Sequence, residues 1–401
     1  MTASFSPSLP EGKVKAPPSK SAAHRLLIAS ALAKGKTEIS NVEFSNDIEA
    51  TLGCLISLGC SVEKKKASVV IDASSFPSYR RPLDCGESGS TMRFFIPLCL
   101  LTGKECVLEG SPRLLSRPTG VYEKLCEEKG FFFHNDGKQI AVRGKLLPGG
   151  YTVDASVSSQ FVTGMMFALS TFERESVLKL VPPVESRPYI EMTADCLRKF
   201  GVKANTGGLT VSVSGKGAFS PKKLEVEGDW SNAAFLEAPD LFGAKVEVTG
   251  LDGDSSQGDR IYRTHFKNLE KGFCEIDLSD TPDLAPVLMA VAGAKKGARF
   301  LSTGRLAVKE SDRGNAMKEE LGKFGIKAEV GKNEITVYPT KPKAPVVPLE
   351  GHNDHRIVMA LSVLLLLTGG EINGAEAVNK SFPSYFDTLR KLKGKVTLYD
   401  S

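Results

Sequence analysis

Two short segments near the C-terminus place cations beside carboxylates, and each adjoins an apolar run. They are 309–313, which reads Lys-Glu-Ser-Asp-Arg, and 353–356, which reads Asn-Asp-His-Arg. Arginine and lysine held in fixed positions suit a ligand with phosphate and carboxylate groups, because they donate strong hydrogen bonds to both. Neighbouring carboxyl groups could then transfer protons. The alternative is that both segments are solvated helix ends with local ion pairs.

Several upstream clusters place hydroxyl groups, glycines or cations where a helix is predicted to begin. They are Ser19, Lys20, Ser21 and Arg25, the segment 86–93, Arg117 with Pro118, and the segment 156–161. Serine hydroxyls and the free N–H groups at the start of a helix bind anions. We therefore expect Lys20 and Arg25 to face the same bound phosphate or carboxylate. Each cluster alone also has an ordinary explanation as a helix cap.

Asp283 and Lys380 are further candidates for proton or charge transfer. Asp283 follows Pro282 directly before an apolar segment, so its carboxylate either caps a helix or acts as a base partly shielded by apolar neighbours. Lys380 is a single cation ahead of the last predicted helix. His352 and His355 are three residues apart but lack an obvious third ligand, so no metal site is predicted.

The composition is that of an ordinary globular protein. The 401 residues are 41% hydrophobic and 25% charged, which predicts a large core and two or three domains. The net charge of +5 is spread along the chain, which favours a local pocket for a small anion over nucleic-acid binding. The apolar run 357–367 is too short to span a bilayer and predicts a core helix.

The eight cysteines indicate a reducing compartment. No two of them have the spacing of a CxxC motif, and no histidine cluster completes a zinc site. We expect them to be reduced and mostly buried in a cytoplasmic protein. The N-terminal residues show no basic-then-apolar signal pattern, in agreement with that expectation.

A glycine recurs after each of six predicted helices, usually followed by two short strands joined by a turn. The glycines are Gly59, Gly130, Gly201, Gly272, Gly325 and Gly394. The first four are spaced by 71 residues. A glycine at the end of a helix suits the left-handed backbone that terminates it. The fourth copy is the least regular, because the segment 277–283 replaces a clean hairpin.

Repeats of this length are supersecondary units, and three per lobe give two lobes. We expect lobe I to comprise 1–15 plus 228–401, and lobe II to comprise 16–227. A first strand at about 4–15 is expected to return to the C-terminal lobe. The crossings at 15–20 and 226–230 would form a hinge, whose closure excludes water from a site.

Taken together and in order, these motifs resemble the EPSP synthase family, the 3-phosphoshikimate 1-carboxyvinyltransferases, over essentially the whole chain. The resemblance rests on Ser19-Lys20-Ser21 with Arg25, Arg117-Pro118, Ser158-Ser159-Gln160, and the segments 309–313 and 353–356. It implies an α/β fold, a two-lobed inside-out α/β barrel with three βαβαββ repeats in each lobe. This agrees with the glycine repeat.

The resemblance also implies an activity. The family moves the enolpyruvyl group of phosphoenolpyruvate onto a ring hydroxyl of shikimate 3-phosphate and releases phosphate, on the route to chorismate and the aromatic amino acids. It uses no metal and no organic cofactor. The implied partners are therefore small-molecule substrates, with no nucleic acid and no membrane, and the implied state is a monomer.

Residue roles follow from the resemblance alone. Shikimate 3-phosphate would contact Lys20, Ser21, Arg25, Ser158, Ser159, Gln160, Ser186, Asp283 and Lys309, with Tyr189 stacked near its ring. Phosphoenolpyruvate would contact Lys20, Gly89, Arg117, Gln160, Arg313, Arg356 and Lys380. Glu310 resembles the family's proton donor and Asp283 its base, while Lys20 and Lys380 would assist proton transfer and stabilise charge on phosphate.

Three positions depart from the family pattern, and two other functions are possible for a chain with these motifs. Glu87, Ser88 and Arg305 stand where many members have asparagine, alanine and asparagine, so an acid near the phosphoenolpyruvate site could change affinity there. The sister enzyme that acts on UDP-N-acetylglucosamine typically has a cysteine in the loop before Arg-Pro, and 111–116 has none. A non-catalytic phospho-ligand-binding protein would not need both Asp283 and Glu310.

Overall fold

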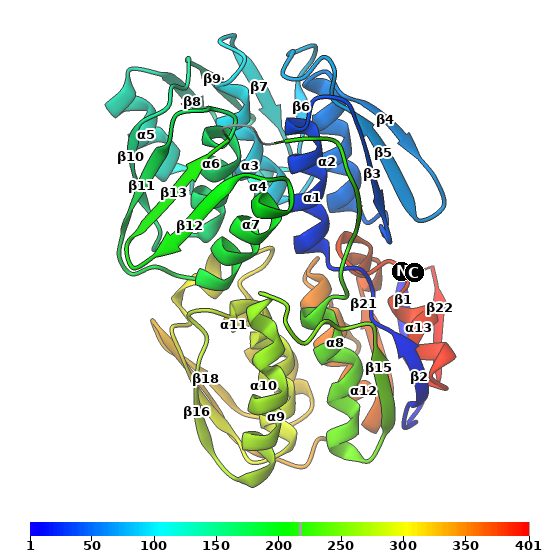
Figure 1. Cartoon of the computed structure of the whole chain (residues 1–401). Coiled ribbons are helices and arrows are strands. Elements are labelled where there is room, and N and C mark those ends of the chain that lie inside the picture. The colour runs from blue at the N-terminus through cyan, green and yellow to red at the C-terminus, as the bar shows by residue number, and fades with distance from the viewer. Residues whose placement is uncertain (216–218, 401) are drawn as a thin grey trace. The chain divides into compact units, whose positions relative to one another are not determined.

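The computed structural model describes residues 1–215 and 219–400 (Figure 1). The chain divides into two compact units. Unit 1 comprises Met1–Ser19, Gly228–Gly253 and Gly258–Ser401, and unit 2 comprises Lys20–Glu227 and Asp254–Gln257. Each unit has its own hydrophobic core of buried aliphatic and aromatic side chains. Each can therefore be described as a separate folded body.

Unit 2 contains three repeats, each built on one four-stranded sheet. The second repeat runs β6 (Leu83–Asp84), α3 (Gly89–Cys99), β7 (Cys106–Glu109), α4 (Pro112–Leu115), α5 (Gly120–Lys129), β8 (Phe132–Asn135) and β9 (Gln139–Arg143). The third runs β10 (Gly150–Asp154), α6 (Ser159–Leu169), β11 (Ser176–Val181), α7 (Arg187–Lys199), β12 (Lys203–Gly207) and β13 (Thr210–Ser214). In both, a helix connects two parallel strands, and an antiparallel hairpin completes the sheet.

The first repeat of unit 2 takes its first strand from far along the chain. Its elements are α1 (Lys20–Leu32), β3 (Lys36–Ser40), α2 (Asn46–Ser57), β4 (Ser61–Lys64), β5 (Ser68–Asp72) and β14 (Lys223–Glu225). Strand β14 pairs in parallel with β3, in the place that β6 and β10 occupy in the other two repeats. Strand β14 therefore completes the first sheet of unit 2 just before the chain returns to unit 1.

Unit 1 repeats the pattern with two changes. Its first repeat runs β2 (Glu11–Lys15), α8 (Trp230–Glu237), η1 (Ala238–Phe242), β15 (Lys245–Thr249), η2 (Gly258–Ile261) and α9 (Tyr262–Lys271). Its second runs β16 (Cys274–Asp277), η3 (Pro282–Leu284), α10 (Ala285–Ala294), β17 (Ala298–Leu301), η4 (Gly304–Val308), α11 (Arg313–Lys323), β18 (Ala328–Val330) and β19 (Glu334–Val337). Its third runs β20 (Leu349–Glu350), α12 (His355–Thr368), β21 (Gly370–Asn373), η5 (Ala375–Lys380), α13 (Tyr385–Lys391) and β22 (Val396–Tyr399), with β1 (Thr2–Phe5).

The two changes in unit 1 concern the fourth and sixth repeats of the chain. Strands β2 and β15 form a two-stranded sheet without a hairpin, as the irregular fourth copy indicated. In the sixth repeat β1 lies between β21 and β22, so the N-terminal strand completes the last sheet. The expected single strand at about 4–15 was wrong, because β1 and β2 are separate. Pro7 and Pro10 lie between them and have no backbone N–H for a ladder.

The recurring glycines end helices in most of the repeats. Gly130 caps α5 with a φ of 66°, and Gly59, Gly201 and Gly325 also have left-handed φ values. The prediction was wrong for Gly272, whose φ of 175° is extended. It was also wrong for Gly394, because the preceding Lys393 takes the left-handed conformation instead.

Nearly enclosed helices such as α6, α10 and α12 fill the interior of their units, whereas α5 and α9 each bury only one face (Figure 1). All but two of the 14 residues of α12 are buried, as expected for a helix enclosed on every side. This confirms the predicted core helix at 357–367. None of the described helices combines the length and hydropathy that a membrane crossing requires. All eight cysteines are free, and seven of them are buried.

Candidate functional site

The guanidinium of Arg313 joins three carboxylates in unit 1. Its Nε lies 2.8 Å from Asp354, its Nη1 2.8 Å from Asp283 and its Nη2 2.8 Å from Glu310. The side chain is only 1% exposed, so these partners replace water almost entirely. Burial would lower the pKa of Arg313, but the three carboxylates outweigh it and raise that pKa. Arg313 is thus a permanently charged centre around which the acids are arranged.

Asp283 in turn lies among three cations. Besides Arg313, Arg356 donates from Nη2 at 3.1 Å and Lys309 from Nζ at 3.4 Å. Burial would raise the pKa of Asp283, but Arg356, Lys309 and Arg313 hold it well below its usual range. Burial lowers the pKa of Lys309 to about 8, with Asp283 opposing the shift. The Asp283 side chain keeps 19% exposure, so a ligand can approach this side of the network.

These contacts decide between the two interpretations of the motifs. Arg313 is buried and bonds to residues 30 and 41 positions away, so 309–313 is not a solvated helix end. Asp283 does not cap α10, which begins without a side-chain cap. Asp354 both caps α12, accepting from the Arg356 N–H, and binds Arg313. Burial would raise the pKa of Asp354, but Arg313, with a smaller contribution from His355, lowers it.

Lys380 stabilises the turn that carries Asp354 and Arg356. Its ammonium donates to the Asn353 carbonyl oxygen at 2.6 Å. His352 and Asn353 have φ values of 48° and 51°, a left-handed conformation that side chains rarely adopt. A buried cation on the turn's carbonyl helps to hold this strained backbone in place. Lys380, which lies just before the last helix as predicted, therefore also contacts the segment 353–356.

A second cluster, in unit 2, lies between α3 and α6. Arg93 donates to the Gln160 side-chain oxygen at 2.7 Å and to the Pro118 carbonyl at 3.2 Å. The Gln160 amide donates to the Ser90 hydroxyl at 2.9 Å. Because both ends of the Gln160 amide are engaged, its orientation is fixed. Arg93 itself is buried, and its contacts join the segments 86–93, 117–118 and 156–161, which lie apart along the chain.

Gly89 and Arg117 approach each other closely in the same unit. A Cβ atom added to Gly89 would lie 2.5 Å from Arg117 Nη1, closer than side chains tolerate. Arg117 is 7% exposed, so its guanidinium has little room to withdraw. A larger residue at position 89 would therefore displace the Arg117 guanidinium from its present position.

Lys20 and Arg25 both lie on α1 but point to different neighbours. The Lys20 ammonium is 2.7 Å from Asp47 on α2, whereas Arg25 donates to the Thr193 hydroxyl and the Tyr189 carbonyl on α7. The Tyr189 ring centroid lies 5.7 Å from the Arg25 guanidinium, a cation–π distance. Burial lowers the pKa of Arg25 to about 10. That one anion bridges Lys20 and Arg25 stays a prediction.

The serines singled out by sequence lie at helix starts. Ser158 caps α6 by accepting from the Gln160 N–H at 3.2 Å, and Ser159 is the buried first residue of that helix. Ser186 precedes α7 with a left-handed φ of 53°. The Ser21 carbonyl accepts from Arg25 at 2.8 Å. The capping interpretation is thus correct for Ser158, and it leaves its role toward a ligand open to experiment.

The predicted residues accordingly fall into two groups. Unit 1 brings together Asp283, Lys309, Glu310, Arg313 and Arg356, with Lys380 on the adjoining turn. Unit 2 contains Lys20, Ser21, Arg25, Gly89, Arg117, Ser158, Ser159, Gln160 and Ser186. Sequence reasoning assigned no role to Arg93, Asp354 or Asp47. Arg93 and Asp354 stood inside quoted motifs, and only their buried contacts show their importance.

Two of the three departures from the family pattern, Ser88 and Arg305, have ordinary structural roles. Ser88 caps α3 by accepting from the Thr91 N–H at 3.2 Å. Glu87, beside it, is partly exposed. Arg305 donates to the Ser279 carbonyl at 2.6 Å and thereby ties η4 to the loop before η3. Neither the Ser88 contact nor the Arg305 contact explains a change in ligand affinity.

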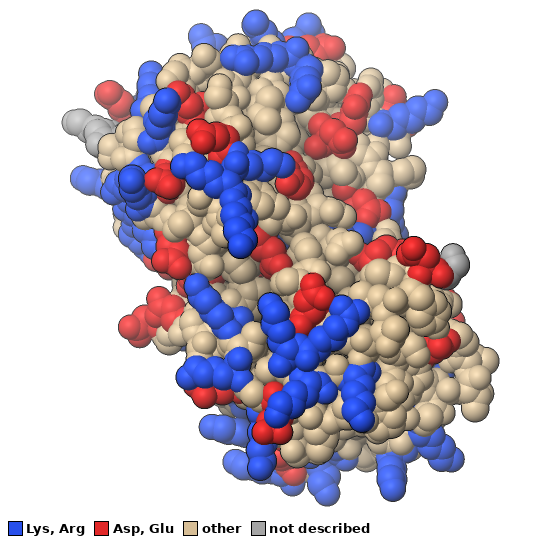
Figure 2. Space-filling model, turned by 90° about the vertical axis from the view of Figure 1, so that its right-hand side faces the viewer, with Lys and Arg blue, Asp and Glu red and all other residues tan. Residues whose placement is uncertain are grey.

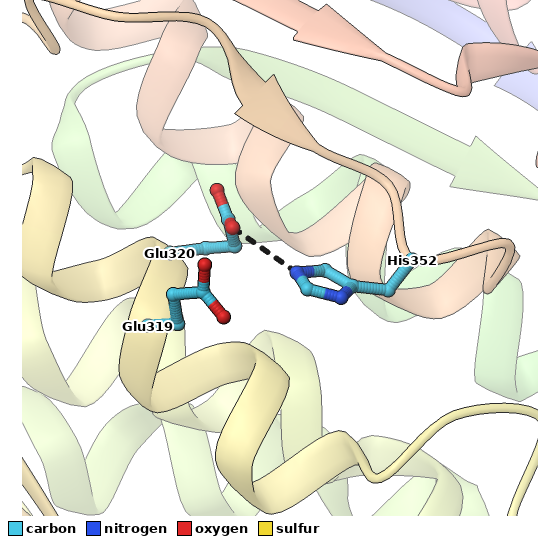
Figure 3. Close-up of side chains that lie close together, drawn as sticks. All are labelled: Glu319, Glu320 and His352. Atoms are coloured by element: carbon cyan, nitrogen blue, oxygen red, sulfur yellow. Dashed lines mark hydrogen bonds and ion pairs between the residues drawn. The ribbon is translucent and has the colours of Figure 1, made fainter.

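One group of side chains among the described residues has the spacing of metal ligands. Glu319, Glu320 and His352 offer ligand atoms within 4.8 Å of one another (Figure 3). His352 therefore has the neighbours that the sequence did not reveal, and they come from α11. The buried Glu320 carboxylate, however, already accepts from the Lys323 ammonium, the Glu350 N–H and His352. An ion would have to displace Lys323, so we assign this group to anchoring the turn at 351–354.

Comparison with known proteins identifies the class and then the family. A model of the EPSP synthase (3-phosphoshikimate 1-carboxyvinyltransferase) family matches residues 7–389. A 3-phosphoshikimate 1-carboxyvinyltransferase of Clostridium kluyveri is 36% identical, covering 98% of this chain and 97% of its own length. One of Clostridium acetobutylicum is 34% identical, covering 96% of each. The chain is thus a transferase, and it belongs to the EPSP synthase family.

The fold agrees with that family. A solved structure of EPSP synthase from Acinetobacter baumannii has a TM-score of 0.78 at 23% identity, and covers 99% of this chain and 100% of its own. A second structure from the same organism has a TM-score of 0.79 at 21% identity. The predicted two-lobed α/β fold is therefore confirmed.

Proposed function

We propose that the Arg313–Asp283 network of unit 1 and the Gln160–Arg93–Arg117 cluster of unit 2 carry the reaction of this family. This chain transfers the enolpyruvyl group of phosphoenolpyruvate to shikimate 3-phosphate, giving 5-enolpyruvylshikimate 3-phosphate and phosphate, in the shikimate pathway. The observation that supports the proposed site best is the arrangement of Arg313, Arg356 and Lys309 around one partly accessible carboxylate. Such cations can bind anionic substrates beside groups that move protons.

The proposed ligand contacts follow the two groups of residues. For phosphoenolpyruvate they are Lys20, Gly89, Arg117, Gln160, Arg313, Arg356 and Lys380. For shikimate 3-phosphate they are Lys20, Ser21, Arg25, Ser158, Ser159, Gln160, Ser186, Asp283 and Lys309. Arginine side chains present paired donors that suit carboxylate and phosphate geometry.

The proposed chemistry is an addition followed by an elimination. Addition of the ring hydroxyl to phosphoenolpyruvate requires a proton on the methylene carbon and removal of the hydroxyl proton. We assign Glu310 as the proton donor and Asp283 as the base, with Lys20 and Lys380 assisting. The tetrahedral intermediate then loses phosphate and returns the added proton. A well-placed acid or base contributes roughly 10²–10⁴-fold in rate.

The charge around Asp283 explains how it could become a base only when substrates are present. In the free protein three cations hold its pKa well below the usual range, which makes it a weak base. A substrate anion bound to Arg356 or Lys309 would neutralise part of that positive charge. The pKa of Asp283 would then rise toward the range in which a carboxylate accepts protons.

Release of phosphate tests the proposed function directly. We expect purified protein to release phosphate only when phosphoenolpyruvate and shikimate 3-phosphate are both present, because phosphate leaves only after the ring hydroxyl has added to phosphoenolpyruvate. Omitting either substrate is the control. Release with UDP-N-acetylglucosamine in place of shikimate 3-phosphate would assign the chain to the sister reaction instead. Binding of both substrates without release would indicate a non-catalytic binding protein.

Gly89→Ala tests the proposed role of Arg117. The added methyl group would meet the guanidinium at 2.5 Å and displace it. We expect the KM for phosphoenolpyruvate to rise roughly tenfold or more, since a hydrogen bond to a charged group contributes about 1.5–3 kcal/mol. The KM for shikimate 3-phosphate should change much less. Gly120→Ala, a glycine at a nearby helix start with open space around its Cβ position, is the matched control.

We propose that substrates close the two units about the crossings near 15–20 and 226–230. Closure would exclude water and strengthen the charge interactions of both clusters. We expect shikimate 3-phosphate to decrease the radius of gyration in solution scattering. Phosphoenolpyruvate alone serves as the comparison, and an unchanged radius with both ligands bound would contradict closure.

The protein acts on small-molecule substrates, and we propose that it works as a monomer in the cytoplasm, without nucleic-acid or membrane partners. The free cysteines favour a reducing compartment. On the face drawn in Figure 2, acidic side chains lie among the basic ones, which is unlike a continuous basic surface for nucleic acid. Mass measurement in solution tests the monomer.

A further inference from the structure

Asp259 is a buried carboxylate of unit 1 to which neither the motifs nor the family resemblance assigned a role. It lies in η2 and is 3% exposed. Its side chain hydrogen-bonds to Ser231 on α8, which is also buried. The Ser231 oxygen lies 2.6 Å from Arg356 Nη1. Asp259 is therefore one residue removed from an arginine of the proposed site.

The direction of these hydrogen bonds is fixed by chemistry. A guanidinium can only donate, so the Ser231 oxygen must accept from Arg356. The single O–H of Ser231 is then left to donate to Asp259. The carboxylate thus orients the hydroxyl with its lone pairs toward the arginine. Without that acceptor the hydroxyl could rotate and offer its hydrogen to other neighbours.

Arg356 stands between two carboxylates as a result. Its Nη2 lies 3.1 Å from Asp283 Oδ2, and its Nη1 contacts both Ser231 and the Asp283 carbonyl oxygen. Burial raises the pKa of Asp259 to about 6, the charge of Asp283 adds to that shift, and Arg356 opposes it. The pKa of Asp259 therefore responds both to the charge of Asp283 and to that of Arg356.

We propose that Asp259 is a positioning residue that holds the Arg356 guanidinium, through Ser231, in the orientation in which it presents its donors to the substrate anion. The proposal rests on the proposed function only in naming that anion as phosphoenolpyruvate. Asp259 does not touch the substrate or the reacting atoms. Its effect passes through one hydroxyl group, so it should disappear when that hydroxyl is removed.

A double-mutant cycle tests this dependence. The variants are Asp259→Leu, which removes the acceptor at similar size, Ser231→Ala, and the two combined. We expect each single variant to raise the KM for phosphoenolpyruvate roughly 10-fold or more, because a charged hydrogen bond loses its geometry. The double variant should be no worse than Ser231→Ala alone, since coupled residues are not additive. Fully additive effects would overturn the proposal.

Asp259→Asn serves as the conservative variant, because its amide oxygen can still accept from Ser231. It should retain most of the affinity for phosphoenolpyruvate that Asp259→Leu loses. If Asp259→Leu does not fold, the KM values of Asp259→Asn and Ser231→Ala still test the positioning role: the first should stay near wild type and the second should rise. The matched control is Asp240→Asn, because Asp240 is another acid of unit 1, partly buried, that accepts from the Val246 N–H instead. It should leave the KM unchanged.

A readout without substrate separates this proposal from the proposed function. The ¹⁵N signals of the Arg356 side chain report its hydrogen bonds in the free protein. We expect them to shift and broaden in Ser231→Ala and Asp259→Leu, and not in Asp240→Asn. If they shift while the wild-type protein releases no phosphate, the positioning role stands and the proposed function fails. If they are unchanged in an active enzyme, the positioning role fails.

Discussion

Replacing Asp283 with asparagine is expected to lower kcat by roughly 10²–10⁴-fold, the usual contribution of a positioned base. Binding should weaken much less. Asparagine keeps the size and one acceptor oxygen, so one of the two arginines that bond to Asp283, Arg313 or Arg356, retains its acceptor. The loss of negative charge also leaves Arg356 and Lys309 freer to bind substrate anions. Steady-state kinetics with each substrate varied in turn separates the two effects.

Asp280→Asn is the matched control for this experiment. Asp280 lies three residues earlier, in the loop before η3, and is exposed. Its replacement should change neither kcat nor KM. An equal loss of binding and turnover in Asp283→Asn would remove Asp283 from the role of base and leave it an electrostatic partner of the arginines.

The repeat architecture was predictable because neighbouring residues in the sequence determine it. A helix that ends at glycine and is followed by a hairpin leaves its mark in adjacent residues, as at Gly130. The same local reasoning failed at Gly272 and Gly394, where a different backbone conformation ends the helix. It expected the first strand to return to the C-terminal lobe but did not separate β1 from β2 or assign β1 to the last sheet, since that pairing joins Thr2 to Asn373 and no local pattern encodes it.

The sequence predicted which residues belong to the site, but not which of their side chains bond to one another. Asp283, Arg313 and Arg356 stood out by type and motif, yet their bonds span 30 and 73 residues along the chain. Two different repeats must fold before these side chains meet. The sequence analysis assigned no role to the carboxylates of Asp354 and Asp259. Asp354 does cap α12, so its second contact with Arg313 left no separate signal in the sequence.

Arg313→Met is expected to destabilise the protein by about 3–5 kcal/mol, the usual result of removing one partner of a buried ion pair. The loss would leave Asp354, which is fully buried, without its strongest cationic partner. Asp283 and Glu310 would lose the same guanidinium. Urea unfolding followed by circular dichroism measures the change. Arg299→Met is the control, because Arg299 also joins two glutamates but lies on an exposed sheet, and the unfolding midpoint should barely move.

The stability difference between Arg313→Met and wild type should depend on pH in a direction that loss of packing alone would not produce. In the wild-type protein the pKa of Asp354 is lowered, so its ionised form stabilises the fold above about pH 3.9, the unfolded value, and that contribution is lost as the pH falls through the folded pKa. Without Arg313, burial dominates and raises the pKa of Asp354 above the unfolded value. Its ionisation then opposes folding, and stability returns as the pH falls. The gap between variant and wild type should therefore narrow from pH 7 to pH 5, and a constant gap would show that Arg313 contributes packing instead of charge.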